Sequence, residues 1–275
     1  MTRPRSRRRW SPLAAATLAL ALAGTLLPLL YLVSVSLMNQ GQVNSGLLVP
    51  PEPAFGNYAD ALAGGTLLPG LLNSLVAAIA GSLITLAIAL PAAWAMARSG
   101  TGGSLLAGTI LSPWLLPPIV AVLPLFVLLR QLGLNNTLPG LVLIYAFANA
   151  GVAIWLLEGF VRRIPPELDE AAQLDGAGPL RILLRVAAPL LSPGLVAVGV
   201  IVAVLNYHEF VLASFLTQSP QAQTVTVVLA NFLGERVQNF GKIAAASIIA
   251  VLPVFAGAVF LQRWLVAGLT SGGVK

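Results

Sequence analysis

The chain has 275 residues, of which 57% are apolar and only 9% are Asp, Glu, Lys or Arg, against about 25% charged residues in an ordinary soluble domain. This composition excludes a soluble globular enzyme, a disordered tail and a secreted disulfide scaffold, and it indicates a polytopic integral membrane protein. The absence of cysteine excludes disulfides and thiolate metal sites, and a single histidine argues against a His-based metal site.

Six apolar runs are long enough for membrane-spanning helices, which need about 20 mostly apolar residues each. They cover residues 12–37, 70–97, 105–129, 139–160, 191–215 and 243–265. Because the runs are continuous and do not alternate, they favour helices over the strands of a membrane barrel. The sequence therefore predicts an all-α integral membrane protein with six transmembrane helices.

The first run follows five arginines between Arg3 and Arg9, as the apolar segment of a signal peptide would. It continues through Pro28 to Leu37, however, which is longer than the roughly 7–15 residues of a signal-peptide core. No clean cleavage site ends it. We therefore expect an uncleaved first span.

The positions of the basic residues predict the orientation, because cytoplasmic segments of membrane proteins are enriched in Lys and Arg. With the N-terminus inside, 12 of the 15 basic residues fall in inside segments and three, Arg130, Arg236 and Lys242, fall outside. Both ends are therefore predicted to be cytoplasmic. The net charge of +6 is then a topology and lipid-headgroup signal, and no nucleic-acid partner is expected.

The spans divide the chain into successive segments. These are a basic N-terminus (1–11), the first span (12–37), an external loop (38–69), a transmembrane core (70–265) and a cytoplasmic tail (266–275). Within the core, the internal loop 161–190 holds eight of the chain's 24 charged residues. In so apolar a chain, this concentration indicates a loop that acts in water.

The sequence of this loop predicts two helices joined by a turn. Pro165-Pro166 ends the fourth span and can begin the first turn of a new helix. Glu167, Asp169 and Glu170 then fall near its N-terminus, where the helix dipole favours acidic residues.

The second helix of the loop is predicted to be amphipathic. It begins at Gly178-Pro179, after Gly176 has ended the first helix. One face carries Leu180, Leu183, Leu184 and Ala187, and another carries Arg181 and Arg185. Pro189 and Pro193 break this helix before the fifth span. The pattern fits either an interfacial connector or a rigid knob that docks a partner.

The same loop resembles the EAA loop of binding-protein-dependent ABC importer permeases. That motif reads EAA, three residues, G, nine residues, I, one residue, then L and P. Here the corresponding residues are Glu170-Ala171-Ala172, Gly176, Val186 and Ala188-Pro189, so Val replaces Ile and Ala replaces Leu. The resemblance extends to Ile164-Pro165 and to Asp175-Gly176-Ala177, and it makes the docking interpretation the stronger one.

Other stretches resemble the carbohydrate-uptake branch of that family, of the maltose-permease second-subunit type. They are Asn57-Tyr58, Asn73-Ser74-Leu75, the run from Ala92 to Arg98, the run from Gly133 to Thr137, and the C-terminus from Gln262 to Lys275. The chain departs from the family at Tyr207-His208-Glu209-Phe210, where such permeases often have Trp-Asn-Glu/Asp-Phe.

The resemblance implies a mechanism and a set of partners. A second, homologous permease subunit would complete a heterodimer, two ATPase subunits would bind ATP and Mg, and an extracytoplasmic binding protein would deliver a sugar. The loop would couple to the ATPase through Glu170, Ala171, Ala172, Asp175, Gly176, Arg181 and Pro189. The chain would lie in the bacterial cytoplasmic (inner) membrane as a multi-pass, non-enzymatic transport subunit.

The chain lacks a nucleotide-binding motif of its own. No Gly-x4-Gly-Lys-Ser/Thr sequence is present, and the glycine-rich stretch 100–104 lacks the lysine that would reach phosphates. We therefore expect no cofactor on this chain, with energy supplied by another chain or by an ion gradient.

Polar residues inside the predicted spans are candidates for function, because they are costly in a bilayer. Glu158 and Arg162, four residues apart, form either a structural ion pair or a gate. The pathway or gate candidates are Asn149, Asn206, Tyr207, His208 and Glu209. A polar cluster packed against another helix explains these residues equally well. A catalytic His208–Glu209 pair is disfavoured, since adjacent residues on a helix point in different directions.

Three classes of function compete. The first is an ABC importer permease, for a sugar or for another solute such as glycerol phosphate or a polyamine. The second is an ion-coupled secondary transporter, which would want midplane carboxylates and an inverted repeat; no repeat is evident, and Glu158 and Glu209 lie off-centre. The third is a membrane-embedded enzyme, which would want clustered catalytic groups that the sequence does not display.

Overall fold

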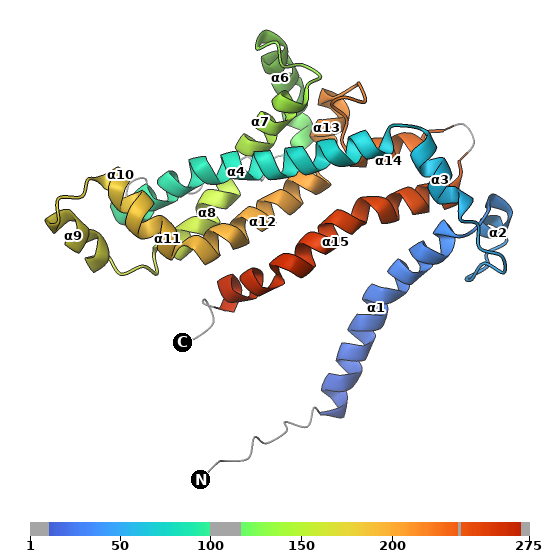
Figure 1. Ribbon diagram of the computed structural model, residues 1–275, viewed down its shortest axis with the longest axis horizontal. Coiled ribbons are helices and arrows are strands. Elements are labelled where there is room, and N and C mark those ends of the chain that lie inside the picture. Colours follow the sequence, from blue (N-terminus) through green and yellow to red (C-terminus); the bar gives the residue numbers. More distant parts are fainter. Residues whose placement is uncertain (1–10, 100–116, 236–237, 271–275) are drawn as a thin grey trace. The chain divides into compact units, whose positions relative to one another are not determined.

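The computed structural model describes residues 11–99, 117–235 and 238–270 (Figure 1). These residues form helices, and no strand occurs among them. The chain divides into two compact units. The smaller unit contains the residues up to Gly64 together with Phe232–Ile249, and the larger contains Gly65–Asn231 together with the residues from Ala250 onward.

The helices follow one another along the chain with short connections. Their bounds are α1 Pro12–Ser36, α2 Gln40–Asn44, α3 Gly56–Ala63, α4 Leu67–Ser99, α6 Pro118–Gln131, α7 Leu138–Ala148, α8 Ala150–Val161, α9 Glu167–Leu174, α10 Pro179–Ile182, the π-helical η1 Leu183–Ala187, α11 Ala188–Leu190, α12 Ser192–His208, α13 Val211–Leu216, α14 Val225–Leu233 and α15 Phe240–Thr270. The predicted external loop 38–69 thus contains two short helices and the first turn of α4.

The smaller unit is held together by a buried asparagine. The Asn57 side-chain amide donates to the carbonyl oxygens of Ser36 and Met38 at 2.9 and 2.8 Å. The neighbouring Tyr58 hydroxyl lies 2.9 Å from the Ser36 hydroxyl. A Cβ on Gly241 would collide with Asn57 and with the Met38 carbonyl, so glycine is required there. Asn57-Tyr58 therefore joins the end of α1 to α3 and to the start of α15.

The larger unit is built around α4, which packs against α7, α8 and α12. Small residues on α4, including Ala77, Ala89 and Ala93, are fully buried in these contacts. Small side chains let helix backbones approach closely, which is how membrane helices associate without a hydrophobic driving force between them. The long helix α4 is thus the scaffold on which the rest of the unit is placed.

The two ends of α4 collect different connecting segments. Near its start, Asn73 donates to the carbonyl oxygens of Pro220 and Gln223 at 3.1 and 2.9 Å, while at its end Arg98 pairs with Asp169. At a helical rise of 1.5 Å per residue, positions 73 and 98 lie about 37 Å apart. The predicted outside segment after position 216 and the predicted inside loop 161–190 therefore lie at opposite ends, as the predicted orientation requires.

The predicted outside turn 130–138 belongs with the first of these groups. Gly133 and Asn136 adopt positive φ after α6. The Asn136 side-chain oxygen accepts from the backbone N–H groups of Gln218 and Ser219 at 2.7 and 3.0 Å. Thr137 then caps α7 by accepting from the Gly140 N–H at 3.2 Å. The stretch from Gly133 to Thr137 is thus used to turn the chain and to tie two outside segments together.

Three described helices are long and apolar enough to cross a membrane: Pro12–Ser36, Leu67–Arg98 and Phe240–Phe260. Two bent pairs pass the same test together: α7 with α8, bent by 46°, and Pro179–Leu190 with α12, bent by 81°. Helix α6 is apolar but shorter, and the beginning of the predicted span 105–129 lies outside the described residues. The six-span topology remains a prediction.

The prediction of one continuous helix over residues 191–215 is wrong. Helix α12 ends at His208, Glu209 has an extended backbone, and α13 begins at Val211. The Glu209 carboxylate accepts from the N–H groups of Leu212 and Ala213 at 2.8 and 3.0 Å, which satisfies donors at the start of the new helix. The apolar run conceals this break because the capping group is itself inside it.

Candidate functional site

The charged loop contains the two predicted helices, α9 and the segment α10–η1–α11. Pro166 precedes α9, and Glu167, Asp169 and Glu170 occupy its first turn, where the helix dipole stabilises acidic side chains. Figure 1 shows α9, α10 and α11 gathered at one end of α4. The predicted coupling residues, from Glu170 to Pro189, are thereby brought into one region.

Gly176 ends α9 in the manner that the sequence predicts. Its φ is 78°, a conformation that costs little for glycine alone. Its N–H donates to the Gln173 carbonyl oxygen, and the Ala177 N–H donates to that of Ala172, both at 2.9 Å. This pair of bonds is a Schellman motif, which satisfies carbonyls at the helix C-terminus and fixes the direction of the following chain. Asp175 is the C-cap and is exposed.

Helix α9 projects into solvent along nearly its whole length. Asp169 is its one buried residue. Glu170 and Ala171 are exposed, Ala172 is half-buried, and Leu174 at the tip is 91% exposed. A large apolar side chain displayed beside acidic ones on a projecting helix is the surface expected of a docking element.

The buried Asp169 pairs with Arg98 at the end of α4. The Arg98 Nε lies 2.5 Å from the Asp169 Oδ2, and the two side chains are 16% and 7% exposed. Sequence reasoning missed this contact, because 71 positions separate the two residues. Arg98 ends the Ala92–Arg98 stretch, and that stretch was the only signal that pointed to it.

The predicted apolar face of the second loop helix is partly wrong. Leu183 and Ala187 are buried, but Leu180 and Leu184 are 68% and 56% exposed, and Ile182 is buried instead. The segment is π-helical over residues 183–187, and i→i+5 bonding widens the turn, so the α-helical spacing does not apply. The buried residues pack with Val161, Ile164 and Leu191.

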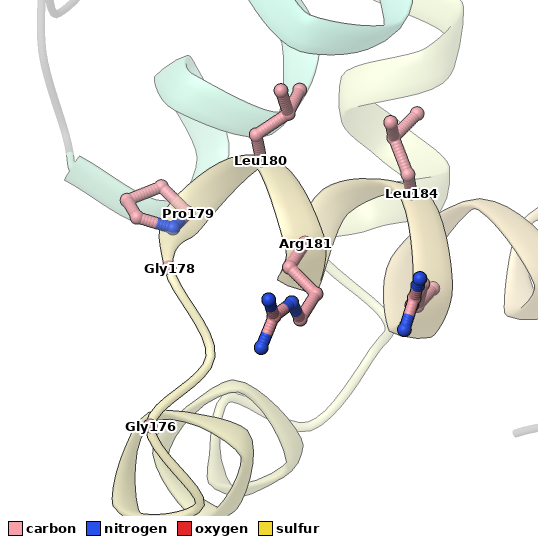
Figure 2. A pocket seen from close by; sticks show the side chains of 7 residues that line it. Gly176, Gly178, Pro179, Leu180, Arg181 and Leu184 are labelled. Carbon is pink, nitrogen blue, oxygen red and sulfur yellow. The ribbon is translucent and has the colours of Figure 1, made fainter.

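The exposed residues of this segment border a shallow depression of roughly 450 Å³. Figure 2 shows Leu180 and Leu184 pointing to one side of the helix and Arg181 to the other. The lining residues are Gly176, Gly178, Pro179, Leu180, Arg181, Leu184 and Arg185. The loop thus displays a second surface, apolar and basic, next to the acidic helix α9.

Pro189 lies in α11, and the chain bends by 81° at Leu191 before α12. Pro193 falls in the first turn of α12, where a proline lacks no needed hydrogen bond. The predicted break between the loop and the fifth span is confirmed, and it turns the loop sharply away from the axis of α12.

The pathway candidates separate into buried and exposed residues. The Asn149 side-chain amide donates to the Asn206 side-chain oxygen at 2.7 Å, and both residues are buried. Asn149 lies at the 46° bend between α7 and α8. The buried Tyr207 hydroxyl donates to the Ala250 carbonyl oxygen at 2.6 Å. His208 is exposed and contacts the Tyr207 ring edge-on, with ring centroids 5.9 Å apart.

Glu209 joins three elements of the larger unit. Besides capping α13, its Oε2 accepts from the Tyr145 hydroxyl on α7 at 3.0 Å. Its backbone carbonyl oxygen accepts from the Thr226 hydroxyl on α14, also at 3.0 Å. The carboxylate is therefore fully engaged inside the protein, as a satisfied polar cluster would be. Of the five pathway candidates, His208 is the one with an exposed side chain.

Glu158 and Arg162 form the ion pair that their spacing suggests. The Arg162 Nη2 and Nε lie 2.5 and 3.0 Å from the Glu158 Oε1. The arginine side chain is 60% exposed and the glutamate 13%. The contact lies within one helix end and joins no other element. In the described part of the chain, no group of three or more His, Asp or Glu residues could hold a metal ion.

The amino-acid sequence matches the family model of the binding-protein-dependent transport system inner membrane component over residues 86–271. The chain belongs to this family. Its members are membrane components of transport systems, so the chain is a multi-pass transport subunit and not an enzyme.

Relatives cover nearly the whole chain. It is 37% identical to the trehalose transport system permease protein SugB of Mycobacterium tuberculosis, over 91% of this chain and 92% of that protein. It is 32% identical to the trehalose/maltose transport system permease protein MalG of Thermococcus litoralis, over 91% of each. It is 31% identical to the melibiose/raffinose/stachyose import permease protein MelC of Bacillus subtilis, over 90% of this chain and 91% of that protein.

Solved structures show the same fold. A bacterial ABC transporter that imports the acidic polysaccharide alginate matches with a TM-score of 0.77 and 21% identity, over 96% of this chain and 99% of that one. The MetNI methionine ABC transporter in an inward-facing conformation matches with a TM-score of 0.62 and 17% identity, over 75% of this chain and 97% of that one. The permease fold is therefore shared between transporters of unlike solutes.

Proposed function

We propose that the chain is the transmembrane permease subunit of an ATP-driven importer that takes up a sugar. Relatives named for trehalose, maltose, melibiose and raffinose transport align with the chain almost end to end. The fold alone does not select a sugar, since the methionine transporter shares it. The choice of a carbohydrate rests on these sequence relatives.

The observation that carries the coupling role is the exposure of α9. This helix bears Glu170-Ala171-Ala172, ends at a fixed Gly176 turn, and offers Leu174 to solvent at its tip. Next to it, Arg181 and Arg185 border the depression of the second loop helix. The two surfaces combine an apolar anchor with charges of both signs, which suits a specific protein partner.

The proposed assembly contains four kinds of protein. This chain pairs with a homologous permease, two ATPase subunits hold ATP and Mg and receive the EAA loops, and an extracytoplasmic binding protein delivers the sugar. A relative in fold is described in complex with an alginate pentasaccharide-bound periplasmic protein. The chain itself lacks a nucleotide-binding motif, and we place the assembly in the bacterial inner membrane.

Copurification and uptake test this proposal. We expect the ATPase subunit to copurify with the detergent-solubilised chain, and we expect Glu170→Lys or Gly176→Asp to abolish uptake. The matched control is Glu52→Lys, which makes the same charge change at an exposed residue of another loop. Absence of any ATPase, together with normal uptake by both loop variants, would falsify the permease assignment.

A solute screen tests the substrate class separately. The assembled importer with its binding protein is offered mono- and oligosaccharides, amino acids, polyamines and glycerol phosphate, and uptake is measured for each. The proposal predicts a response to a carbohydrate. A response restricted to amino acids or polyamines would leave the permease role intact and overturn the sugar assignment.

A further inference from the structure

Helix α9 is attached to the larger unit in an unusual way. A surface helix normally packs through a stripe of buried apolar residues. In α9 the one buried residue is an acid, Asp169, while Leu168 and Leu174 are exposed. Helix α9 makes only light contacts with α10 and η1. Its firmest attachment is therefore the ion pair between Asp169 and Arg98.

The partner of Asp169 belongs to the main scaffold of the unit. Arg98 lies in the last turn of α4, a helix of 33 residues that packs against α7, α8 and α12. The contact therefore bypasses the connecting residues Arg162–Pro166 and joins α9 directly to the helix with the most partners. A displacement of α9 along this contact moves the end of α4.

The pair depends on a single contact. The Arg98 Nε meets the Asp169 Oδ2, while the Arg98 Nη2 and the Asp169 Oδ1 are buried and find no hydrogen-bond partner in the described part of the chain. A charge-assisted contact between buried groups is short, directional and little screened by salt. Removing either member leaves the other as an uncompensated buried charge.

We propose that Arg98 and Asp169 are a positioning pair that transmits the motion of α9 to α4 during transport. This inference rests on the proposed function, because α9 moves only if a partner pulls it. Neither residue touches the ATPase in this account. The pair holds α9 so that a pull on the helix tip shifts α4 instead of pivoting α9 about its flanking loops.

The first test measures transport per ATP in the complete importer, reconstituted in liposomes. In Asp169→Asn, which keeps the side-chain size, we expect ATP hydrolysis stimulated by the binding protein to persist while uptake per ATP falls by about tenfold, within the usual range of coupling factors. The control is Glu235→Gln, which breaks the more exposed pair with Lys242, and it should leave the ratio unchanged. An unchanged ratio in Asp169→Asn would overturn the proposal.

The second test replaces the ion pair by a covalent link. The chain contains no cysteine, so Arg98→Cys with Asp169→Cys creates the one thiol pair, and no buried charge is left behind. A cleavable bis-thiosulfonate reagent should restore uptake per ATP in the assembled importer, and reduction of the linker should remove it again. Each single-cysteine variant treated with the same reagent is the control.

These results separate a positioning role from a structural one. A pair needed only for folding would leave the cleaved and linked forms of one assembled importer equally active, which contradicts the proposal. Failure of the proposed function looks different, because the unaltered chain would then bind no ATPase and show no stimulated hydrolysis at all.

Discussion

The larger unit contains two polar regions that use their polar groups in opposite ways. In the loop that contains α9, most charges face solvent and a single acid, Asp169, is buried. Around Asn149, Asn206 and Glu209, the polar groups are turned toward one another and toward helix ends. The exposed region is suited to a partner, and the inward-facing region holds broken helices in place.

The comparison teaches that a polar residue in a predicted span is not by itself evidence of a transport site. Glu209 sits where the apolar run predicts a continuous helix, and its carboxylate instead starts α13 and binds Tyr145. A bilayer penalises unpaired backbone groups, so a break in a span needs side chains of this kind nearby. The exposed His208 next to it remains the candidate for the pathway.

The largest effect is expected at Glu209, which tests whether the inward-facing region is structural. Glu209→Ala leaves the Tyr145 hydroxyl and the N–H groups of Leu212 and Ala213 without their acceptor, and we expect a loss of about 2–4 kcal/mol in stability. Tyr145→Phe removes one of these bonds and should cost about 0.6–1 kcal/mol. Thermal unfolding of the purified protein measures both.

A double variant isolates the contact at Glu209. If the account is right, adding Tyr145→Phe to Glu209→Ala costs less than Tyr145→Phe costs alone, because the shared bond is already gone. Strictly additive losses would show that the two side chains do not interact, and a fully stable Glu209→Ala protein would contradict the structural role.

A smaller effect is expected at Gly176, which tests whether the exposed region needs a fixed shape. Gly176→Ala places a Cβ on a residue with φ of 78°, and we expect a cost of about 1–2 kcal/mol, concentrated in the loop. The control, Gly159→Ala, adds the same methyl group in open space without positive φ. Protease nicking of the loop should rise in Gly176→Ala and stay unchanged in the control.

The smallest effect on stability is expected at His208, because its side chain is exposed. His208→Ala should change the unfolding free energy by less than about 0.5 kcal/mol. If His208 lines the pathway, the same variant alters the KM or the maximal rate of sugar uptake. Normal uptake kinetics would remove His208 from the pathway and leave none of the five predicted residues with an exposed side chain.

Local sequence signals were sufficient for much of the loop. Acidic residues after Pro166, glycine at position 176 and Gly178-Pro179 each act within one helix end, so they can be recognised without knowing the fold. The same holds for the long apolar helices α1, α4 and α15 and for the break at Leu191 between two prolines.

Features that depend on distant residues could not be predicted. Asp169 is one of several acids in its helix, and only its contact with Arg98 distinguishes it. The break at Glu209 depends on Tyr145 from another helix. The exposure of Leu180 and Leu184 follows from a π-helical turn, which the usual α-helical spacing does not describe.

The most direct test of the central claim is photocrosslinking from the tip of α9. Leu174→Cys provides a single thiol in the cysteine-free chain, which is labelled with a benzophenone reagent in the assembled importer; Val251→Cys on α15 is the exposed apolar control. The account predicts an adduct with the ATPase subunit from position 174 whose yield changes when ATP is added, and none from position 251. An adduct only with lipid from position 174 would contradict it.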